Sequence, residues 1–398
     1  MIITLVTDQF FQNNHGTSVS GQRIYNGLVA LGHTVRVLTV DNGKNTEYAL
    51  KERNFGKFVN GIIHSQGFQF GKPEREIMKK AIEGSDVVHI YLPFKLGYKA
   101  IQMCRELNVP CTAAFHLAPE NITSTLYLNK SHLVNGALWR SFYNKTYRYI
   151  KHIHTPSLMI ANQLVDHKYA ANLHVISNGF NDIFKISPEE KPSILKDKIV
   201  ITFVGRFSRE KRHNLIIKAV NMSKYRNQIQ LIFAGKGPTK GHIMKMAKRL
   251  PNYPFFTFLS RPQLVSVFNF SDLYIHPADV EIEGMSCLEA IACGCVPIVS
   301  NAPKSASSQF TVHKNSIFEH GNAKDLAKKI DWWIEHPKEW KEQRKIVAQH
   351  AQNFTLEKSM EHYVDMFEAA IKDFDKDYDG KDKKKAIKTK IINPYNKK

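Results

Sequence analysis

The part of the chain that most constrains its fold is residues 273–299, which read as strand, loop, helix and strand. An apolar run at 273–277 predicts the first strand, and a second apolar run at 296–299 predicts the last. Residues 285–292 have helical composition and are closed by Gly294. Such a unit builds a parallel sheet, and the loop after its first strand lies where open α/β sheets bind ligands.

Two carboxylates mark this loop and helix. Glu281 lies in the loop, Gly284 follows it, and Glu289 lies on the helix eight positions after Glu281. The helix N-terminus suits a phosphate because it carries free N–H groups and partial positive charge. The two acids can hold two hydroxyl groups beside that phosphate. The spacing alone leaves another interpretation open, in which both are solvated acids on a surface helix.

The Glu-x7-Glu pattern resembles the donor-site signature of the retaining GT-B glycosyltransferases of family 4. Gly284 inside the pattern and Gly-Cys-Val-Pro-Ile-Val at 294–299 carry the resemblance further. It extends over most of residues 1–370 and is strongest in the second half. It implies that Glu281 bonds the transferred sugar and that Glu289 bonds the nucleotide ribose. It also implies an α/β fold of GT-B type, two Rossmann-like domains whose parallel sheets face a central cleft.

The chain is long enough for two domains, since it has 398 residues and 43% hydrophobic content. We expect an N-terminal acceptor domain at 1–180, completed by a C-terminal helix at 356–372, and a donor domain at 181–355. A Pro- and Lys-rich stretch at 187–198 is interpreted as the linker. The Lys-rich end, 376–398, predicts a disordered tail that either aids solubility or contacts anionic lipid.

Several patterns bear on the compartment. No apolar run approaches the roughly 18 to 20 residues of a membrane span. The first residues lack a basic region and a cleavage site, so they predict a strand and not a signal peptide. The five cysteines have no second ligand pair at zinc spacing, which favours reduced thiols. We expect a cytoplasmic protein, peripheral on the inner face of the cell membrane.

The net charge of +20 implies an anionic partner. Nucleic acid, a nucleotide sugar and an acidic membrane surface all qualify. The sequence lacks a zinc-finger pattern, an RNP-type aromatic signature and a basic region leading into heptads. We therefore expect a nucleotide sugar and an anionic membrane as partners, and no nucleic acid.

The N-terminal stretch predicts a Rossmann-type βαβ opening, with a strand at 2–7, a polar loop at 8–20 and a helix at 21–31. Gly16 in the loop lets a phosphate or sugar approach the backbone, although an ordinary turn explains one glycine equally well. The resemblance places this loop facing the donor and acceptor.

A second candidate in this half is His116, which directly follows an apolar strand at 110–115. A titratable residue at a strand end lies where sites are built, but it can also be a satisfied histidine that caps the strand. The resemblance implies that His116 touches the transferred sugar near its reacting centre. The following residues depart from the common His-Thr, so we predict a specialised acceptor pocket that includes Glu120 and Asn121.

Residues 133–150 combine aromatic and basic side chains at helical spacing. Trp139 and Phe142 share one side, while Arg140, Lys145 and Arg148 are interleaved with them. A basic, aromatic-rich helix of this kind is typical of an interfacial membrane anchor. A core-facing helix with a solvated rim fits the pattern as well.

The second half supplies a candidate diphosphate clamp. An apolar strand at 199–204 leads into Gly205 and Arg206, and Lys211 follows at the start of the next helix. An Arg fork and a Lys point charge beside a helix N-terminus suit a diphosphate, whereas the alternative is surface charge. The resemblance assigns both cations to the donor diphosphate.

Three further residues complete the predicted donor site. Gly235 and Gly237 follow a strand at 230–234. Gly-x-Gly alone is a weak signal, and without Gly-Lys-Ser or Gly-Lys-Thr it is not a P-loop. The resemblance places this turn beside the nucleotide. We also predict a contact between the donor and Met285, which begins the helix after Gly284.

Taken with these patterns, the resemblance implies a retaining, metal-independent hexosyltransferase that uses UDP-glucose. The predicted catalytic residues are His116, Arg206, Lys211 and Glu281, with the cations neutralising the leaving diphosphate in place of a metal. The chain resembles bacterial synthases that glucosylate diacylglycerol or monoglucosyldiacylglycerol. Two alternatives stay open: a soluble or capsule-assembly glycosyltransferase with a sugar acceptor, and a non-catalytic binder of polyanions.

Overall fold

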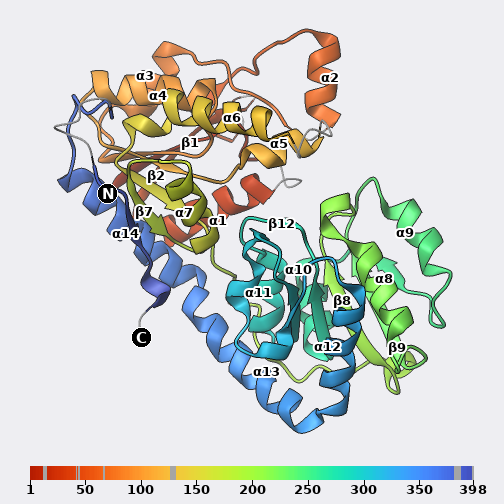
Figure 1. Ribbon diagram of the computed structural model, residues 1–398. Coiled ribbons are helices and arrows are strands. Elements are labelled where there is room, and N and C mark those ends of the chain that lie inside the picture. The colour runs from red at the N-terminus through yellow and green to blue at the C-terminus, as the bar shows by residue number, and fades with distance from the viewer. Residues whose placement is uncertain are drawn as a thin grey trace. The chain divides into compact units, whose positions relative to one another are not determined.

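The computed structural model (Figure 1) describes residues 1–11, 16–41, 43, 45–65, 68–125, 131–380 and 387–396. The chain divides into two compact units. The first comprises Met1–Asn178 and Glu357–Lys398, and the second comprises Gly179–Leu356. The chain therefore leaves the first unit after Asn178 and returns to it at Glu357. The boundaries expected from the sequence were 180 and 356.

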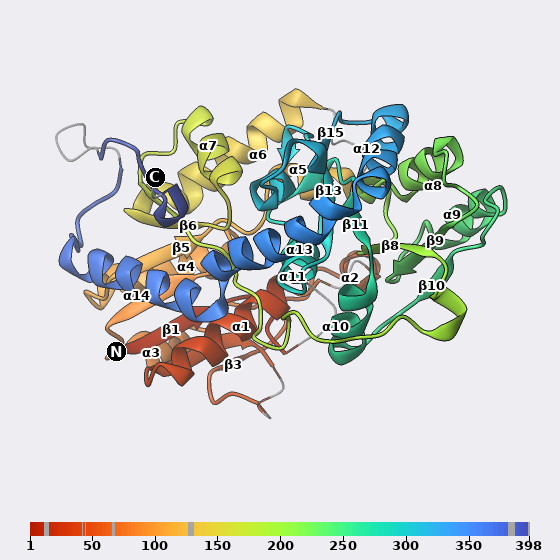
Figure 2. The ribbon, with the colours of Figure 1, turned by 90° about the horizontal axis from the view of Figure 1, so that it is seen from below.

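The first unit is built on an eight-stranded parallel sheet of order β16-β7-β6-β5-β4-β1-β2-β3. Its strands are β1 (Ile2–Val6), β2 (Thr34–Val40), β3 (Ala49–Leu50), β4 (Val87–Ile90), β5 (Cys111–Ala114), β6 (His152–Thr155), β7 (Asn172–Val175) and β16 (Lys390–Ile392). Its helices are α1 (Gly16–Ala30), α2 (Lys57–Ser65), α3 (Arg75–Ile82), α4 (Lys95–Glu106), α5 (Pro119–Thr125), α6 (His132–Lys145), α7 (Leu158–Asp166) and α14 (Leu356–Lys372). Helix α14 packs on this sheet (Figure 2), where the hydroxyl of Tyr363 lies 2.8 Å from Nδ1 of His154.

The second unit has a six-stranded parallel sheet of order β10-β9-β8-β11-β13-β15 and a small pair, β12-β14. Its strands are β8 (Ile199–Val204), β9 (Ile229–Ala234), β10 (Phe255–Thr257), β11 (Leu273–His276), β12 (Val280–Glu281), β13 (Val296–Ser300), β14 (Lys304–Ser305) and β15 (Ile317–Phe318). Its helices are α8 (His213–Met222), α9 (Lys240–Ala247), α10 (Arg261–Phe270), α11 (Met285–Ala292), α12 (Ala323–Glu335) and α13 (Pro337–Ala351). The strand order reverses at β8, because β9 and β10 lie on one side of it and β11 on the other. Such a switch point is where open parallel sheets bind ligands.

Helices cover both faces of the second sheet (Figure 1), which explains why its central strands are apolar on both sides. Helices α8, α9 and α12 lie on one face, and α10, α11 and α13 lie on the other. Ile216 of α8, Phe233 of β9 and Trp333 of α12 belong to one buried cluster. The expected helix at 285–292 is α11 with the same bounds.

Two local expectations were wrong. Helix α1 begins at Gly16, so this glycine opens the helix and does not lie in a long loop, and residues 12–15 lie outside the described part of the chain. The stretch 187–198 belongs to the second unit and does not join the two. It is fixed there because the Ser187 amide donates to Asn269 at 2.7 Å and Lys191 pairs with Asp272 at 2.6 Å.

The predicted membrane anchor is also wrong, because its aromatic side chains face the core of the first unit. Trp139 and Phe142 are only 2% and 6% exposed. The Trp139 ring stacks on Phe115, with centroids 5.1 Å apart, and on His167 at 4.1 Å. Arg140 and Lys145 are exposed on the other side of α6. The helix is thus of the core-facing kind that the pattern also allowed.

The predicted disorder of 376–398 is wrong wherever these residues are described. Residues 373–380, the C-terminal strap, lie on the first unit, and β16 then adds a parallel strand beside β7. Three basic side chains donate to strap carbonyls: Arg105 to Lys376, Arg148 to Asp379 and Lys151 to Asp373. Arg148, predicted to touch lipid, therefore holds the strap. Residues 381–386, 397 and 398 lie outside the described part.

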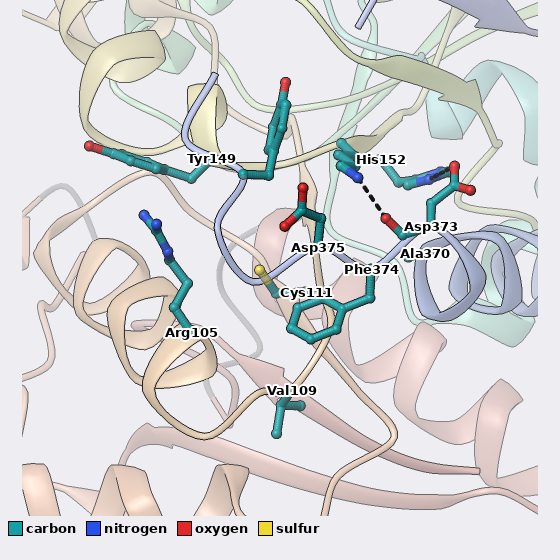
Figure 3. A pocket seen from close by; sticks show the side chains of 11 residues that line it. Arg105, Val109, Cys111, Tyr149, His152, Ala370, Asp373, Phe374 and Asp375 are labelled. Atoms are coloured by element: carbon teal, nitrogen blue, oxygen red, sulfur yellow. Dashed lines mark hydrogen bonds and ion pairs between the residues drawn. The ribbon is translucent and has the colours of Figure 1, made fainter. Parts of the chain in front are cut away.

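The strap also covers one end of the sheet. Its residues Asp373, Phe374 and Asp375 line a small pocket with Cys111 and His152 (Figure 3). Nε2 of His152 lies 3.2 Å from the Asp373 carboxylate. The Tyr395 hydroxyl accepts a hydrogen bond from the Ser177 amide at 2.9 Å, next to the point where the chain leaves this unit.

The buried position of Trp139 predicts a large effect of its removal on stability. Trp139→Ala should lower the free energy of unfolding by about 3–5 kcal/mol, because it leaves a cavity between Phe115 and His167. Leu133→Ala, on the same helix but 85% exposed, should change it by less than about 0.5 kcal/mol. Urea unfolding of both variants measures the difference in the free energy of unfolding. Equally small losses in the two variants would contradict the buried position of Trp139.

Candidate functional site

The donor-site candidates gather at the switch point of the second sheet. Gly205 and Arg206 follow β8, Gly235 and Gly237 follow β9, and β12 and α11 follow β11. These loops leave the carboxyl ends of three neighbouring strands. The structure thus brings together, within one unit, motifs that are up to 84 positions apart in the sequence.

The loops after β8 and β9 are in direct backbone contact, which is why two of their residues are glycines. A Cβ at Gly235 would lie 2.0 Å from the Gly205 carbonyl, and one at Gly237 would lie 2.4 Å from the Phe207 carbonyl. Hydrogen bonds join the loops, from the Phe207 amide to Lys236 O at 2.9 Å and from the Thr239 amide to Phe207 O at 3.1 Å. This contact fixes the backbone on either side of Arg206.

The two predicted cations differ in their surroundings. The Arg206 side chain is exposed, and no described residue forms a hydrogen bond or ion pair with its guanidinium. Lys211, at the end of a 3₁₀ turn (Arg209–Lys211), pairs with the Glu281 carboxylate. The first cation is therefore available to an anion, while the second already neutralises an acid of the site.

Glu281 is held by two donors on one oxygen. Lys211 and the Nε2 atom of His276, at 3.0 Å, both reach Oε2. Burial would raise the pKa of Glu281, but the Lys211 charge and the hydrogen bonds from His276 and Lys211 outweigh it and lower the pKa to about 2. The group is therefore a carboxylate throughout the neutral range and an acceptor only.

The second carboxylate lies on the helix that follows. Gly284 precedes α11 with a φ of 96°, a left-handed conformation that favours glycine, and a Cβ there would lie 2.8 Å from Ser307 Oγ. Met285 begins the helix, and Glu289, four residues later, lies on the same face. Glu289 is only 8% exposed.

In the first unit, His116 lies just beyond β5, beside the ends of β4 and β6. Its ring centroid is 4.4 Å from that of Tyr91 and 5.0 Å from that of His154. Burial, aided by the charges of His154 and His89, holds the pKa of His116 well below its usual range, so the imidazole is neutral. Its Nε2 is buried without a hydrogen-bond partner among the described residues, as is Nε2 of the neighbouring His89.

The acceptor candidates lie one turn away along the chain. Glu120 and Asn121 belong to the short helix α5. Asp8, two residues after the end of β1, was missed by the sequence analysis. It is 2% exposed, and burial raises its pKa to about 7 although the Gly71 amide donates to it at 2.9 Å. Its position at a strand end was the available signal.

His276 and Tyr274 were also missed, and both lie beside Glu281 at the candidate donor site. They share a face of β11 because side chains alternate along a strand, which the sequence already implied. The Tyr274 hydroxyl lies 3.0 Å from Nδ1 of His276 and 2.8 Å from Oγ of Ser286. In the described part of the chain, no cluster of three or more His, Cys, Asp and Glu side chains is placed to hold a metal ion.

Known protein families match the chain in two parts. Residues 15–182 match the family described as "Glycosyltransferase Family 4", and residues 186–354 match "Glycosyl transferases group 1". The alpha-monoglucosyldiacylglycerol synthase of Streptococcus pneumoniae is 23% identical over 321 residues, which cover 76% of this chain and 71% of the relative.

Two solved structures extend the comparison. Anabaena Alr3699/HepE, in complex with UDP and glucose, is 16% identical with a TM-score of 0.66, covering 93% of this chain and 100% of that one. The catalytic domain of the cholesterol-alpha-glucosyltransferase from Helicobacter pylori is 42% identical with a TM-score of 0.39, covering 39% of this chain and 99% of that one. The full-length likeness confirms the predicted fold class, two Rossmann-like units of GT-B type.

The lowered pKa of Glu281 predicts a pH-dependent contribution to stability. A folded-state pKa below the ordinary 4.5 stabilises the fold above that value, and the contribution is lost as the pH falls toward about 2. At pH 7 the free energy of unfolding of the wild type should exceed that of Glu281→Gln by about 2–3 kcal/mol. This difference should close below about pH 4.5. Urea unfolding across this range measures it, with Glu342→Gln on the exposed side of α13 as control. A gap that is independent of pH would contradict the ion pair.

Proposed function

Since the chain belongs to the glycosyltransferases that join a family 4 domain to a group 1 domain, we propose that it transfers glucose from UDP-glucose, with retention, to a hydroxyl group of a membrane lipid. The observation that carries the proposal is the set of charges at the switch point of the second sheet. An unpaired Arg206, a paired Lys211 and an oriented Glu281 offer one site for a diphosphate and one for sugar hydroxyls.

The diphosphate would lie on Arg206 and Lys211. The guanidinium can bind two phosphate oxygens at once, and the ammonium adds a point charge beside it. Both stabilise the charge that develops on UDP as the bond to the sugar breaks. This division of roles lets the protein's own cations act where other enzymes use a metal, so activity should persist in EDTA.

The sugar and the ribose would be held by the two acids. The oxygen of Glu281 that faces neither Lys211 nor His276 can accept from a hydroxyl of the glucose. Glu289, buried on α11, would accept from the ribose. A retaining reaction then needs the acceptor hydroxyl to attack on the face that UDP leaves, with the departing phosphate taking the acceptor proton.

The first unit would present the acceptor. His116 is neutral and has a buried Nε2 without a described partner, so it can hydrogen-bond a sugar hydroxyl without adding charge near the reacting carbon. Glu120 and Asn121 follow on α5 as acceptor contacts. The HepE structure with UDP and glucose and the name of the Streptococcus pneumoniae relative support a UDP-glucose donor and a diacylglycerol-type acceptor.

Contact with a membrane would not use the buried aromatic side chains of α6. Among the described residues of the first unit, the most exposed large apolar side chains are Phe58 on α2 and Leu133 at the start of α6, at 81% and 85%. The net charge of +20 attracts the chain to an anionic surface. No helix in the described ranges is long and apolar enough to cross a membrane. We place the protein at the inner face of the cell membrane as a peripheral enzyme.

Nucleotide release tests the proposal most directly. UDP-glucose and GDP-mannose are each offered with anionic vesicles that contain diacylglycerol, monoglucosyldiacylglycerol or a sterol, and with soluble sugars in place of vesicles. The proposal is supported if UDP is released from UDP-glucose only in the presence of a hydroxyl-bearing lipid and the product is α-linked. Activity on soluble sugars alone favours the capsule-type alternative. No release from any donor leaves only polyanion binding and sinks the proposal.

The clamp predicts a charge-specific loss of activity. Arg206→Ala should lower the rate of transfer by about 10²- to 10³-fold, because it removes one preorganised cation from the leaving diphosphate. Arg226→Ala, an exposed arginine on the turn after α8, should leave the rate unchanged. Steady-state kinetics with UDP titrations compare them. Near-wild-type turnover in Arg206→Ala would place the donor site elsewhere.

A further inference from the structure

The Glu281 carboxylate is bound asymmetrically. Both of its protein donors, Lys211 and His276, reach the same oxygen, Oε2. No hydrogen-bond donor in the described ranges lies on Oε1. One oxygen is therefore occupied by the protein and the other is left to accept from something else.

His276 is itself held on its far side. It is 1% exposed at the end of β11, and its Nδ1 lies 3.0 Å from the Tyr274 hydroxyl. An ionised Glu281 can only accept, so Nε2 carries the proton. Burial lowers the pKa of His276 although Glu281 raises it, so the ring is neutral and Nδ1 must accept from the Tyr274 O–H. These two hydrogen bonds fix the tautomer of His276 and the plane of its ring.

The chain of contacts ends on the backbone of the central strand. Ser286 lies 2.8 Å from the Tyr274 hydroxyl, and its Oγ lies 2.9 Å from the carbonyl of Val204, the last residue of β8. With the Tyr274 proton on His276, the one proton of Ser286 serves either Tyr274 or the Val204 carbonyl. The close contacts nevertheless form one chain, in the order Val204, Ser286, Tyr274, His276 and Glu281. It runs from β8 through α11 and β11 to β12, entirely within the second unit.

We propose that His276 is a positioning residue for sugar transfer, which together with Tyr274 sets the plane of the Glu281 carboxylate so that Oε1 faces a hydroxyl of the donor sugar. The inference rests on the proposed role of Glu281 in binding the transferred sugar. Lys211 alone could not set this plane, because an ammonium on a flexible stem is a rotatable point charge. A second donor on the same oxygen, aimed by a fixed ring, removes that freedom.

A merely structural role for His276 makes different predictions. If the network served only folding, its loss would lower stability and all ligand affinities together. If His276 positions Glu281, its removal should impair the binding and transfer of the sugar. The affinity for UDP, which lacks the sugar, should be unchanged. The readouts are therefore kcat for transfer, KM for UDP-glucose, Kd for UDP and the unfolding midpoint in urea.

The test compares His276→Phe, which removes the N–H donor, with His276→Gln, whose amide can still donate to Glu281. We expect about a 10- to 100-fold loss of kcat in His276→Phe, because a misplaced contact at the reacting group costs about this much, with Kd for UDP unchanged. His276→Gln should recover most of the loss. Tyr274→Phe should show a smaller loss of the same kind. Tyr225→Phe, a tyrosine next to α12, is the matched control and should behave as wild type.

A double variant decides whether His276 acts through Glu281. His276→Phe combined with Glu281→Gln should be no slower than Glu281→Gln alone, because the positioned group is already lost. Full additivity, parallel loss of UDP affinity, or equal activity of His276→Phe and wild type would each overturn the inference. If His276→Phe does not fold, the same comparison is made with Tyr274→Phe. If Glu281→Gln itself transfers normally, the proposed function of Glu281 fails instead.

Discussion

The structure of the candidate donor site depends on one half-buried charge, the carboxylate of Glu281. An ionised group in this position would be costly without compensation, and Lys211 and His276 supply it together. Lys211 follows β8 and His276 ends β11, and these strands are neighbours in the sheet. The ion pair can therefore form only when the chain has crossed from β10 back past β8. Sheet order, and not proximity in sequence, creates the site.

Close backbone contact imposes a second constraint on the same region. Gly235 and Gly237 let the loop after β9 lie directly against residues 205–207, where any side chain would collide with a carbonyl. The result is a rigid frame around Arg206, whose guanidinium no described residue engages. A rigid loop that presents an unpaired cation loses little entropy when it binds a diphosphate. The same two glycines therefore allow the close backbone contact and fix the loop that presents Arg206.

The first unit uses buried polar residues differently. His89, His116 and His154 lie near one another at the centre of its sheet, with centroids 6.5 Å apart for His89 and His154. Burial lowers the pKa of each, so the cluster carries no charge at neutral pH. Hydrogen bonds satisfy His154 on both sides, from Tyr363 and to the carbonyl of Ile176. His116 differs from it in having a buried nitrogen without a described partner.

The sequence by itself determined the alternation of strands and helices, because apolar period and turn residues are local properties. Its motifs also carried the resemblance that implied the GT-B class and the roles of the donor residues. It could not decide which face of an amphipathic helix is buried, so Trp139 and Phe142 were open to two interpretations until Phe115 and His167 were placed beside them. The Lys-rich end predicted disorder, yet β16 pairs with β7, since a parallel strand can form from distant residues. Likewise, alternation put Tyr274 and His276 on one face of β11, but only the tertiary structure brought Glu281, Lys211 and Ser286 to them. Hydrogen bonds and ion pairs between distant segments require a register and a distance that no local pattern contains.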